Sequence, residues 1–165
     1  NLLLSKIDKN YMIANGPAFI DKFNFYHTDS SKKRIYKIKT NKNYKIVSKK
    51  IFKKFNLKDG APDGMTLDKN QNLWVAHFHG ACLSVFNKNG KKIHQIIFPA
   101  KNITNCAFGG VNNSELFVTS ATKSMNKSEM QKYRFSGSLF SVKTNMKGFV
   151  QKKFILSNAK KRSLL

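Results

Sequence analysis

Asn15, Asp63 and Asn105 are oxygen-bearing side chains that each stand at the head of an apolar, strand-like run. Their contexts are "NGPAF", "DGMTL" and "NCAFGG". Carboxylate and amide oxygens are the donors that Ca²⁺ and Mg²⁺ prefer, and Mn²⁺ and Zn²⁺ also accept them. The trio contains no His, which argues against a site for softer metals. If the fold brings the three together, we expect a site for one divalent cation.

Asn-Gly and Asp-Gly are also ordinary turn dipeptides, because Asn, Asp and Gly all tolerate positive φ. For Asn15 taken alone, a turn is the better explanation. Two observations favour a site: the pattern repeats at matching places, and Pro62 fixes the backbone before Asp63. A chain with eight acidic and 31 basic residues keeps this carboxylate between Pro62 and Gly64. Asp63 is therefore the first candidate for chemistry.

The elements that must position these residues are strands. Short runs rich in Phe, Tyr, Ile and Val, separated by Asn, Gly, Asp and Lys, predict an all-β fold. No segment sustains apolar residues at helical spacing over three turns. The runs that begin at Asn15 and at Asp63 are each followed by further runs ten and twenty residues later. Four strands per unit, at a period of 42 to 48 residues, are typical of a β-propeller.

We expect three four-stranded blades and a basic tail, at residues 12–58, 60–101, 102–157 and 158–165. The fourth strands are expected at "KIVSKKIF", "KIHQIIF" and "VQKKFIL". The first strand of a propeller blade usually lies nearest the central channel, so Asn15, Asp63 and Asn105 would converge at one mouth of it. Thr104 is expected beside Asn105 as a polar lining residue or water holder. Three blades are too few to close a ring.

The net charge of +23 raises nucleic-acid binding as a function. The 31 basic residues comprise 28 Lys and 3 Arg, and the lysines are scattered along the chain. Nucleic-acid sites favour Arg for bidentate contacts and gather their charge on one face. We therefore expect no specific nucleic-acid site. A basic binding module would instead show DNA binding that falls steeply with salt.

Cysteine usage and hydropathy bound the remaining classes. Cys82 and Cys106 lie in apolar, strand-like runs without metal-site spacing, and we expect both to be reduced and structural. No run of about 18 apolar residues is present, so we expect no membrane span. The opening "NLLLSKIDKNYMI" contains a Lys and an Asp, which is unlike a signal peptide. We expect a cytoplasmic protein.

In these motifs the chain resembles the family of senescence marker protein, regucalcin and gluconolactonase. The matching stretches, in order, are "NGPAF", "YHTDS", "APDGMTLDKNQNLWVAH" and "NITNCAFGGVNNSELFVTSA", and "GSLFSV" fits the penultimate strand of a blade. The resemblance runs from about Asn10 to Leu156. It implies a six-bladed propeller, of which this chain would be the C-terminal half, completed by the remaining blades of the same propeller.

Members of that family are metal-dependent lactonases that hydrolyse sugar lactones to aldonic acids. The resemblance implies that Asn15 and Asp63 are metal ligands and that Asp63 is the general base toward the attacking water. It implies one divalent cation (Ca²⁺, Zn²⁺, Mg²⁺ or Mn²⁺) as cofactor and a sugar lactone as partner. The family's Glu ligand has no match in residues 1–14. With three blades missing, we expect the 165 residues alone to show little activity and weak metal binding.

Several alternatives stay open at this point. One is a non-catalytic propeller that binds calcium or another ligand. A strictosidine-synthase-like propeller is more distant, because the Pro-Asp-Gly-Met motif favours the lactonases. We expect Asp29 to be structural and a metal site built on His77 and His79 to be disfavoured. The inserted loop over 122–136 is either part of a lid or an ordinary long loop. The chain has no Gly-x-Ser-x-Gly elbow, which argues against a serine esterase.

Overall fold

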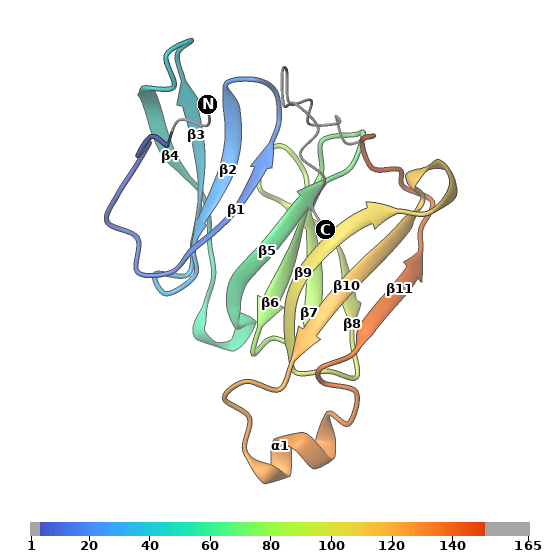
Figure 1. Ribbon diagram of the computed structural model, residues 1–165. Coiled ribbons are helices and arrows are strands. Elements are labelled where there is room, and N and C mark those ends of the chain that lie inside the picture. The colour runs from blue at the N-terminus through green and yellow to red at the C-terminus, as the bar shows by residue number, and fades with distance from the viewer. Residues whose placement is uncertain (1–3, 151–165) are drawn as a thin grey trace, which may run out of the picture.

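Figure 1 shows a computed structural model of the chain, which describes residues 4–150, as three antiparallel sheets arranged like a fan. The first two sheets each contain four strands in sequence order. Their strands are β1 (Ala14–Phe19), β2 (Asn24–Asp29), β3 (Arg34–Thr40) and β4 (Ile46–Lys54), then β5 (Ala61–Leu67), β6 (Leu73–Phe78), β7 (Cys82–Phe86) and β8 (Lys92–Ile97). The first two expected sets of four strands are therefore present.

The third sheet has the order β11-β10-β9 within the described residues. Its strands are β9 (Asn102–Gly109), β10 (Glu115–Ala121) and β11 (Leu139–Lys143). The fourth strand expected at "VQKKFIL" begins at Val150 and lies almost entirely outside residues 4–150, as does the basic tail. The blade boundaries given above remain expectations.

The middle sheet is buried on both faces, and the alternation of β6 shows how. Leu73 and Val75 join one apolar cluster with residues of the first sheet, whereas Trp74 and Ala76 join a second cluster with the third sheet. Successive side chains of a strand point to opposite faces, so one strand supplies both cores. A strand buried on both faces has a continuous apolar run, as "LWVA" does.

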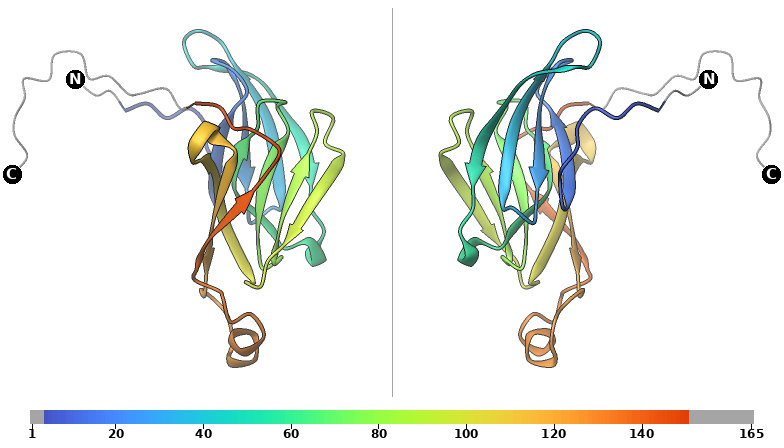
Figure 2. Two further views of the ribbon diagram at one scale, coloured as in Figure 1. Left: turned by 90° about the vertical axis from the view of Figure 1, so that its right-hand side faces the viewer. Right: turned by 90° about the vertical axis from the view of Figure 1, so that its left-hand side faces the viewer.

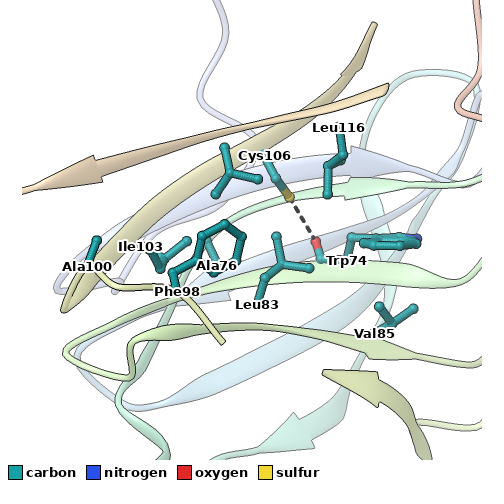
Figure 3. Packing of buried hydrophobic residues seen from close by; sticks show 10 residues of the cluster. Trp74, Ala76, Leu83, Val85, Phe98, Ala100, Ile103, Cys106 and Leu116 are labelled. Atoms are coloured by element: carbon teal, nitrogen blue, oxygen red, sulfur yellow. Dashed lines mark hydrogen bonds between the residues drawn. The ribbon is translucent and has the colours of Figure 1, made fainter. Parts of the chain in front are cut away.

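Figure 3 shows the packing of the second cluster between the middle and third sheets. Its buried members are Trp74, Ala76, Leu83, Val85, Phe98, Ala100, Ile103, Cys106, Leu116 and Val118. The thiol of Cys106 donates to the carbonyl oxygen of Trp74 at 3.6 Å, and burial raises the pKa of this thiol to about 12. Cys82 is likewise free and buried. Both cysteines therefore lie in the structure as the inert apolar residues expected of them.

The inserted loop between β10 and β11 contains the short helix α1 (Lys127–Lys132), which the all-β prediction did not include. Figure 2 shows the insertion projecting beyond one end of the strands. Asn126 accepts from the Glu129 amide at 2.9 Å, and the Glu129 carboxylate accepts from the Asn126 amide at 3.1 Å. This capping box starts the helix. Two 3-10 turns, η1 (Leu57–Asp59) and η2 (Val111–Asn113), complete the regular elements of residues 4–150. Among residues 4–150, no helix is long and apolar enough to cross a membrane.

Candidate active site at the inner strands

The first strands of the three sheets lie side by side at the inner edge of the fan, in the order β1, β5, β9 (Figure 1). All three run in the same direction, and the insertion that carries α1 lies at the end where they begin. The residues predicted to do chemistry are on these strands. Asn15 is the second residue of β1, Asp63 the third of β5 and Asn105 the fourth of β9.

A β-bulge interrupts each inner strand near the predicted residues. The pairing of β1 with β2 shifts between Asn15 and Ala18, and that of β5 with β6 shifts between Pro62 and Met65. In β9 a shift in the pairing with β10 leaves Thr104 as the extra residue. Bulges bend a strand, interrupt its hydrogen-bond ladder and redirect side chains, and they are over-represented beside active sites.

A cavity of about 190 Å³ lies between the bulged segments. Its lining residues are Asn15, Gly16, Pro17, Gly64, Met65, Thr104 and Asn105. Three of the four predicted site residues therefore border one space. The fourth, Asp63, adjoins the cavity through its chain neighbour Gly64. Each of the three sheets therefore contributes lining residues to this cavity.

Asn15 is half-buried, and its side-chain amide is fixed in position. Its Nδ2 donates to the Ser30 hydroxyl oxygen at 3.0 Å. Because Nδ2 is engaged by Ser30, the carbonyl oxygen Oδ1 is the atom left to act as an acceptor or a metal ligand. Ser30 is a buried residue that directly follows β2, so the second strand of the same sheet holds the amide in place.

Asp63 is also half-buried, and burial raises the pKa of its carboxyl group from 3.8 to about 6. The Gly64 amide opposes this shift by hydrogen bonding, which favours the ionised form. None of the ion pairs in residues 4–150 involves Asp63. A carboxylate that is buried without a cationic partner is a group that a bound cation would stabilise.

Gly64 is held tightly against the third sheet. A Cβ atom at this position would lie 2.2 Å from Oδ1 of Asn105 and 2.7 Å from the carbonyl oxygen of Thr104. Oδ1 of Asn105 also accepts from the Cys106 amide at 2.8 Å, and the Thr104 hydroxyl lies 2.7 Å from that of Thr119. Only glycine allows β5 and β9 to approach this closely. This contact is the feature of the site that the sequence did not indicate.

The structure also places the other residues considered in the sequence analysis, Asp29, His77 and His79. Asp29 is buried, and its Oδ1 accepts from the Lys32 amide at 3.2 Å, so it bonds a turn amide as expected. His77 is buried in β6, whereas His79 lies beyond the end of that strand with a positive φ of 62°. The two histidines therefore do not share a strand face, because β6 ends at Phe78 and the chain turns at His79.

The donor set fits a hard cation only in part. Asn15 lines the cavity and Asp63 directly precedes its lining residue Gly64, and amide and carboxylate oxygens suit Ca²⁺, Mg²⁺ or Mn²⁺. Within residues 4–150, no group of three or more His, Cys, Asp and Glu side chains could hold a metal ion. Two protein donors are fewer than such cations take. Further ligands, including the Glu that the resemblance implies, would have to come from outside the described residues or from water.

Three antiparallel sheets pack face to face around one inner edge. This arrangement defines the chain as part of a β-propeller. Residues 2–122 match the family described as SMP-30/Gluconolactonase/LRE-like region, and the chain belongs to that family.

Known relatives extend this result. The chain is 39% identical to regucalcin of Danio rerio over 85 residues, covering 51% of this chain and 29% of the relative. It is 28% identical to the pentonolactonase XacC of Haloferax volcanii over 120 residues, or 72% and 41% of the two chains. The structure of a calcium-binding regucalcin from Agrobacterium tumefaciens superposes with a TM-score of 0.80 at 22% identity, covering 88% of this chain and 50% of the other. This chain matches half or less of the length of each.

Proposed function

We propose that this chain supplies part of the active site of a divalent-metal-dependent lactonase that hydrolyses a sugar lactone to an aldonic acid. In this proposal the chain is the C-terminal half of a six-bladed propeller. The observation that carries the proposal is the meeting of Asn15, Thr104 and Asn105 at one cavity between three bulged inner strands, where Gly64, the chain neighbour of Asp63, also lines the space. Relatives named as lactonases support the reaction class.

Asn15 and Asp63 are the proposed ligands of the cation. When bound, a divalent cation supplies positive charge that polarises a lactone carbonyl. Asn15 contributes a neutral oxygen that Ser30 holds in place, and Asp63 contributes the charged one. Thr104 and Asn105 line the cavity as hydrogen-bonding groups that can orient lactone hydroxyls or water. The donor types leave the identity of the cation open among Ca²⁺, Zn²⁺, Mg²⁺ and Mn²⁺.

Asp63 is also the proposed general base. Its carboxylate accepts a proton from water as the water oxygen bonds to the lactone carbonyl carbon. The bond from that carbon to the ring oxygen then breaks, and the proton is returned to the ring oxygen, which becomes a hydroxyl of the open-chain acid. Without a cation the pKa of Asp63 is about 6, and a bound cation would favour the charged form further, so the carboxylate is ionised at pH 7 and available to accept a proton.

Exposed apolar side chains on the flanks of the fan support the existence of further blades. On the first sheet Phe19 is 56% exposed, and its ring packs on that of Phe25. On the third sheet Leu139 is 66% exposed. Neighbouring blades of a propeller cover such faces, and large exposed apolar patches mark contact surfaces. We therefore propose that the remaining blades of the same propeller pack on both flanks.

Metal removal tests the proposed function. The full-length protein is incubated with a chelator, dialysed and assayed by pH-stat with glucono-1,5-lactone, and with arabinonolactone and galactonolactone in parallel. Spontaneous hydrolysis is subtracted. We expect hydrolysis to fall to the background rate and to return when Ca²⁺, Zn²⁺, Mg²⁺ or Mn²⁺ is added. The rank order of the lactones identifies the substrate class.

Two other results would reject the proposal. Undiminished hydrolysis after complete metal removal would show that the reaction does not depend on a cation. Saturable metal binding without hydrolysis of any lactone would instead establish the alternative function, a propeller that binds calcium or another ligand.

A further inference from the structure

A second cavity, of about 170 Å³, lies at the seam between the first and second sheets, away from the inner strands. Its lining comes from β4 and η1 on one side and from β6, β7 and β8 on the other. The polar lining residues are Lys53, Lys58, Asp59, His77, Cys82, Ser84, Lys92 and Gln95. None of them belongs to the cavity of the proposed lactonase site, so that function does not account for them.

His77 is the most informative of these residues. Its side chain is 3% exposed, and its Nδ1 lies 2.7 Å from the carbonyl oxygen of Asp59. A carbonyl oxygen only accepts, so Nδ1 carries the hydrogen and donates. The other nitrogen, Nε2, is buried without a hydrogen-bond partner in residues 4–150. Buried polar atoms in native proteins almost always have a partner, and an exception needs a cause such as a bound ligand.

The charge around the cavity is positive. Lys53, Lys58 and Lys92 line it, and none of them forms an ion pair among the described residues. Lysines are so abundant in this chain that three of them alone would mean little. Together with the unpartnered Nε2 of His77, they border one partly open cavity: the three ammonium groups are donors, whereas Nε2 is an acceptor when the ring is neutral, because Nδ1 carries the hydrogen. Such a cluster favours an anion with several oxygen atoms.

The carboxylate and thiol groups that line this second cavity argue against a bound cation. The Asp59 carboxylate accepts from the Asn56 amide at 2.8 Å and so already has a partner. Burial raises the pKa of the Cys82 thiol and keeps it protonated, whereas metals bind the thiolate. Lysines beside the space repel a cation, and residues 4–150 contain no group of three or more His, Cys, Asp or Glu side chains that could hold a metal ion.

The size of the cavity narrows the ligand class. At about 170 Å³ it exceeds the roughly 30 Å³ share of one water molecule in the liquid. It is also smaller than the roughly 300–1,000 Å³ of pockets that enclose drug-sized ligands. A tetrahedral oxyanion, or the phosphate end of a larger molecule, fits between these limits.

We infer that this cavity binds a phosphate group, held by Lys53 of the first sheet, Lys92 of the second and the buried Nε2 of His77. Phosphate satisfies Nε2 in either state of the ring: a protonated ring donates to a phosphate oxygen, and a neutral ring accepts from a phosphate O–H. The ligand is either free inorganic phosphate or the phosphate of a small ester such as a sugar phosphate. Because it would touch both sheets, its binding would also stabilise their packing.

The test is a titration of the full-length protein with inorganic phosphate at constant ionic strength, followed by nitrogen-15 NMR of the histidine side chains. Exposed His94, which does not line the cavity, is the internal control. We expect saturable shifts of the His77 ring nitrogens without matching shifts of His94. A second titration with glucose 6-phosphate distinguishes the two sources, because an ester-specific site binds it at least about tenfold more tightly than inorganic phosphate.

Two double variants with equal net charge sharpen the experiment. Lys53→Gln with Lys92→Gln removes two lysines that line the cavity, whereas Lys54→Gln with Lys91→Gln removes their exposed neighbours, which do not. We expect the first to weaken phosphate binding about tenfold or more and the second to change it less than about twofold, since charge-assisted contacts act at short range. Unshifted His77 nitrogens with both ligands, or equal losses in both double variants, would overturn the inference.

Discussion

Asp63→Asn is expected to lower kcat/KM for lactone hydrolysis by about 10³-fold or more in the full-length protein, because general bases alone contribute about 10²–10⁴-fold. The variant keeps the shape of the side chain and one acceptor oxygen, but it has no carboxylate to take a proton from water. It also removes the negative charge that attracts the cation, so metal affinity falls as well. Hydrolysis by pH-stat and metal titration by calorimetry measure the two effects separately.

Asp21→Asn is the matched control. Asp21 is an exposed turn residue whose Oδ1 accepts from the amides of Phe23 and Asn24, and asparagine keeps that acceptor. The control changes net charge by the same amount and is expected to retain wild-type kcat/KM within about twofold, since isolated surface changes have small effects. If Asp63→Asn retained wild-type hydrolysis, the assignment of Asp63 as base would be wrong.

The Asp63→Asn variant is also expected to stabilise the metal-free fold. The pKa of Asp63 is about 6 in the folded state, above its ordinary value of 3.8. Between about pH 4 and 6 the folded state therefore holds a proton that the unfolded state has lost, and stability falls as pH rises through this window. The amide that replaces the carboxyl group does not titrate. The difference in free energy of unfolding between the variant and the wild type should therefore grow from about pH 4 to about pH 6 and stay constant above pH 6.

The size of this advantage is bounded by the pKa shift. At about 1.4 kcal/mol per pKa unit, the full shift corresponds to about 3 kcal/mol, and solvent screening at a half-buried site reduces this to roughly 1–2 kcal/mol. Urea unfolding at pH 4 and pH 7 in chelator measures it. A metal-free wild type that is more stable than the variant at pH 7 would show that a cationic group of the protein pairs with Asp63.

Gly64→Ala is expected to damage the site without touching any reacting group. The added Cβ would meet a side-chain oxygen of Asn105, which can rotate, and the Thr104 carbonyl oxygen, which is backbone and cannot. The strands β5 and β9 must then separate at the cavity. Overpacking of this kind costs about 1–3 kcal/mol of stability. A displacement of about 1 Å at a catalytic site costs about 10²-fold in rate.

Gly109→Ala serves as the comparison for Gly64→Ala. Gly109 is in β9 as well, but its nearest contact for a Cβ is a ring carbon of Phe117 at 3.1 Å, which can tilt away. We expect this control to retain kcat/KM and to lose less than about 1 kcal/mol in urea unfolding. Wild-type activity and stability in Gly64→Ala would show that the close approach of β5 and β9 is not needed.

The strands were predictable from sequence because each has a local signature. Apolar and polar residues alternate in β3 at "RIYKIKT", and β6 contains the continuous apolar run "LWVA", which is typical of a strand buried on both faces. The period of the repeat then placed three strands at one inner edge, which no single strand could have indicated. The helix α1 was missed although its capping box, Asn126 followed by Glu129, is visible in the sequence.

The details of the site were less predictable, because they depend on contacts between sheets. Asn15 and Asp63 could be chosen from the repeat. The bulges beside them are shifts in the pairing with the neighbouring strand, so they depend on a partner segment as well as on the bulged strand itself. The contact of Gly64 with Asn105 joins residues 41 positions apart. The buried Nε2 of His77 likewise follows from a carbonyl of Asp59 in another element, so its sequence neighbours give no sign of it.

The position of the bound cation decides whether Asn15 and Asp63 are metal ligands. Crystals of the full-length protein are soaked with Mn²⁺, and anomalous diffraction locates the ion. We predict a peak bonded to Oδ1 of Asn15 and to the Asp63 carboxylate, at about 2.0–2.6 Å as for oxygen ligands of hard cations. A peak bound elsewhere, with these two side chains uncoordinated at saturating Mn²⁺, would contradict the proposed site.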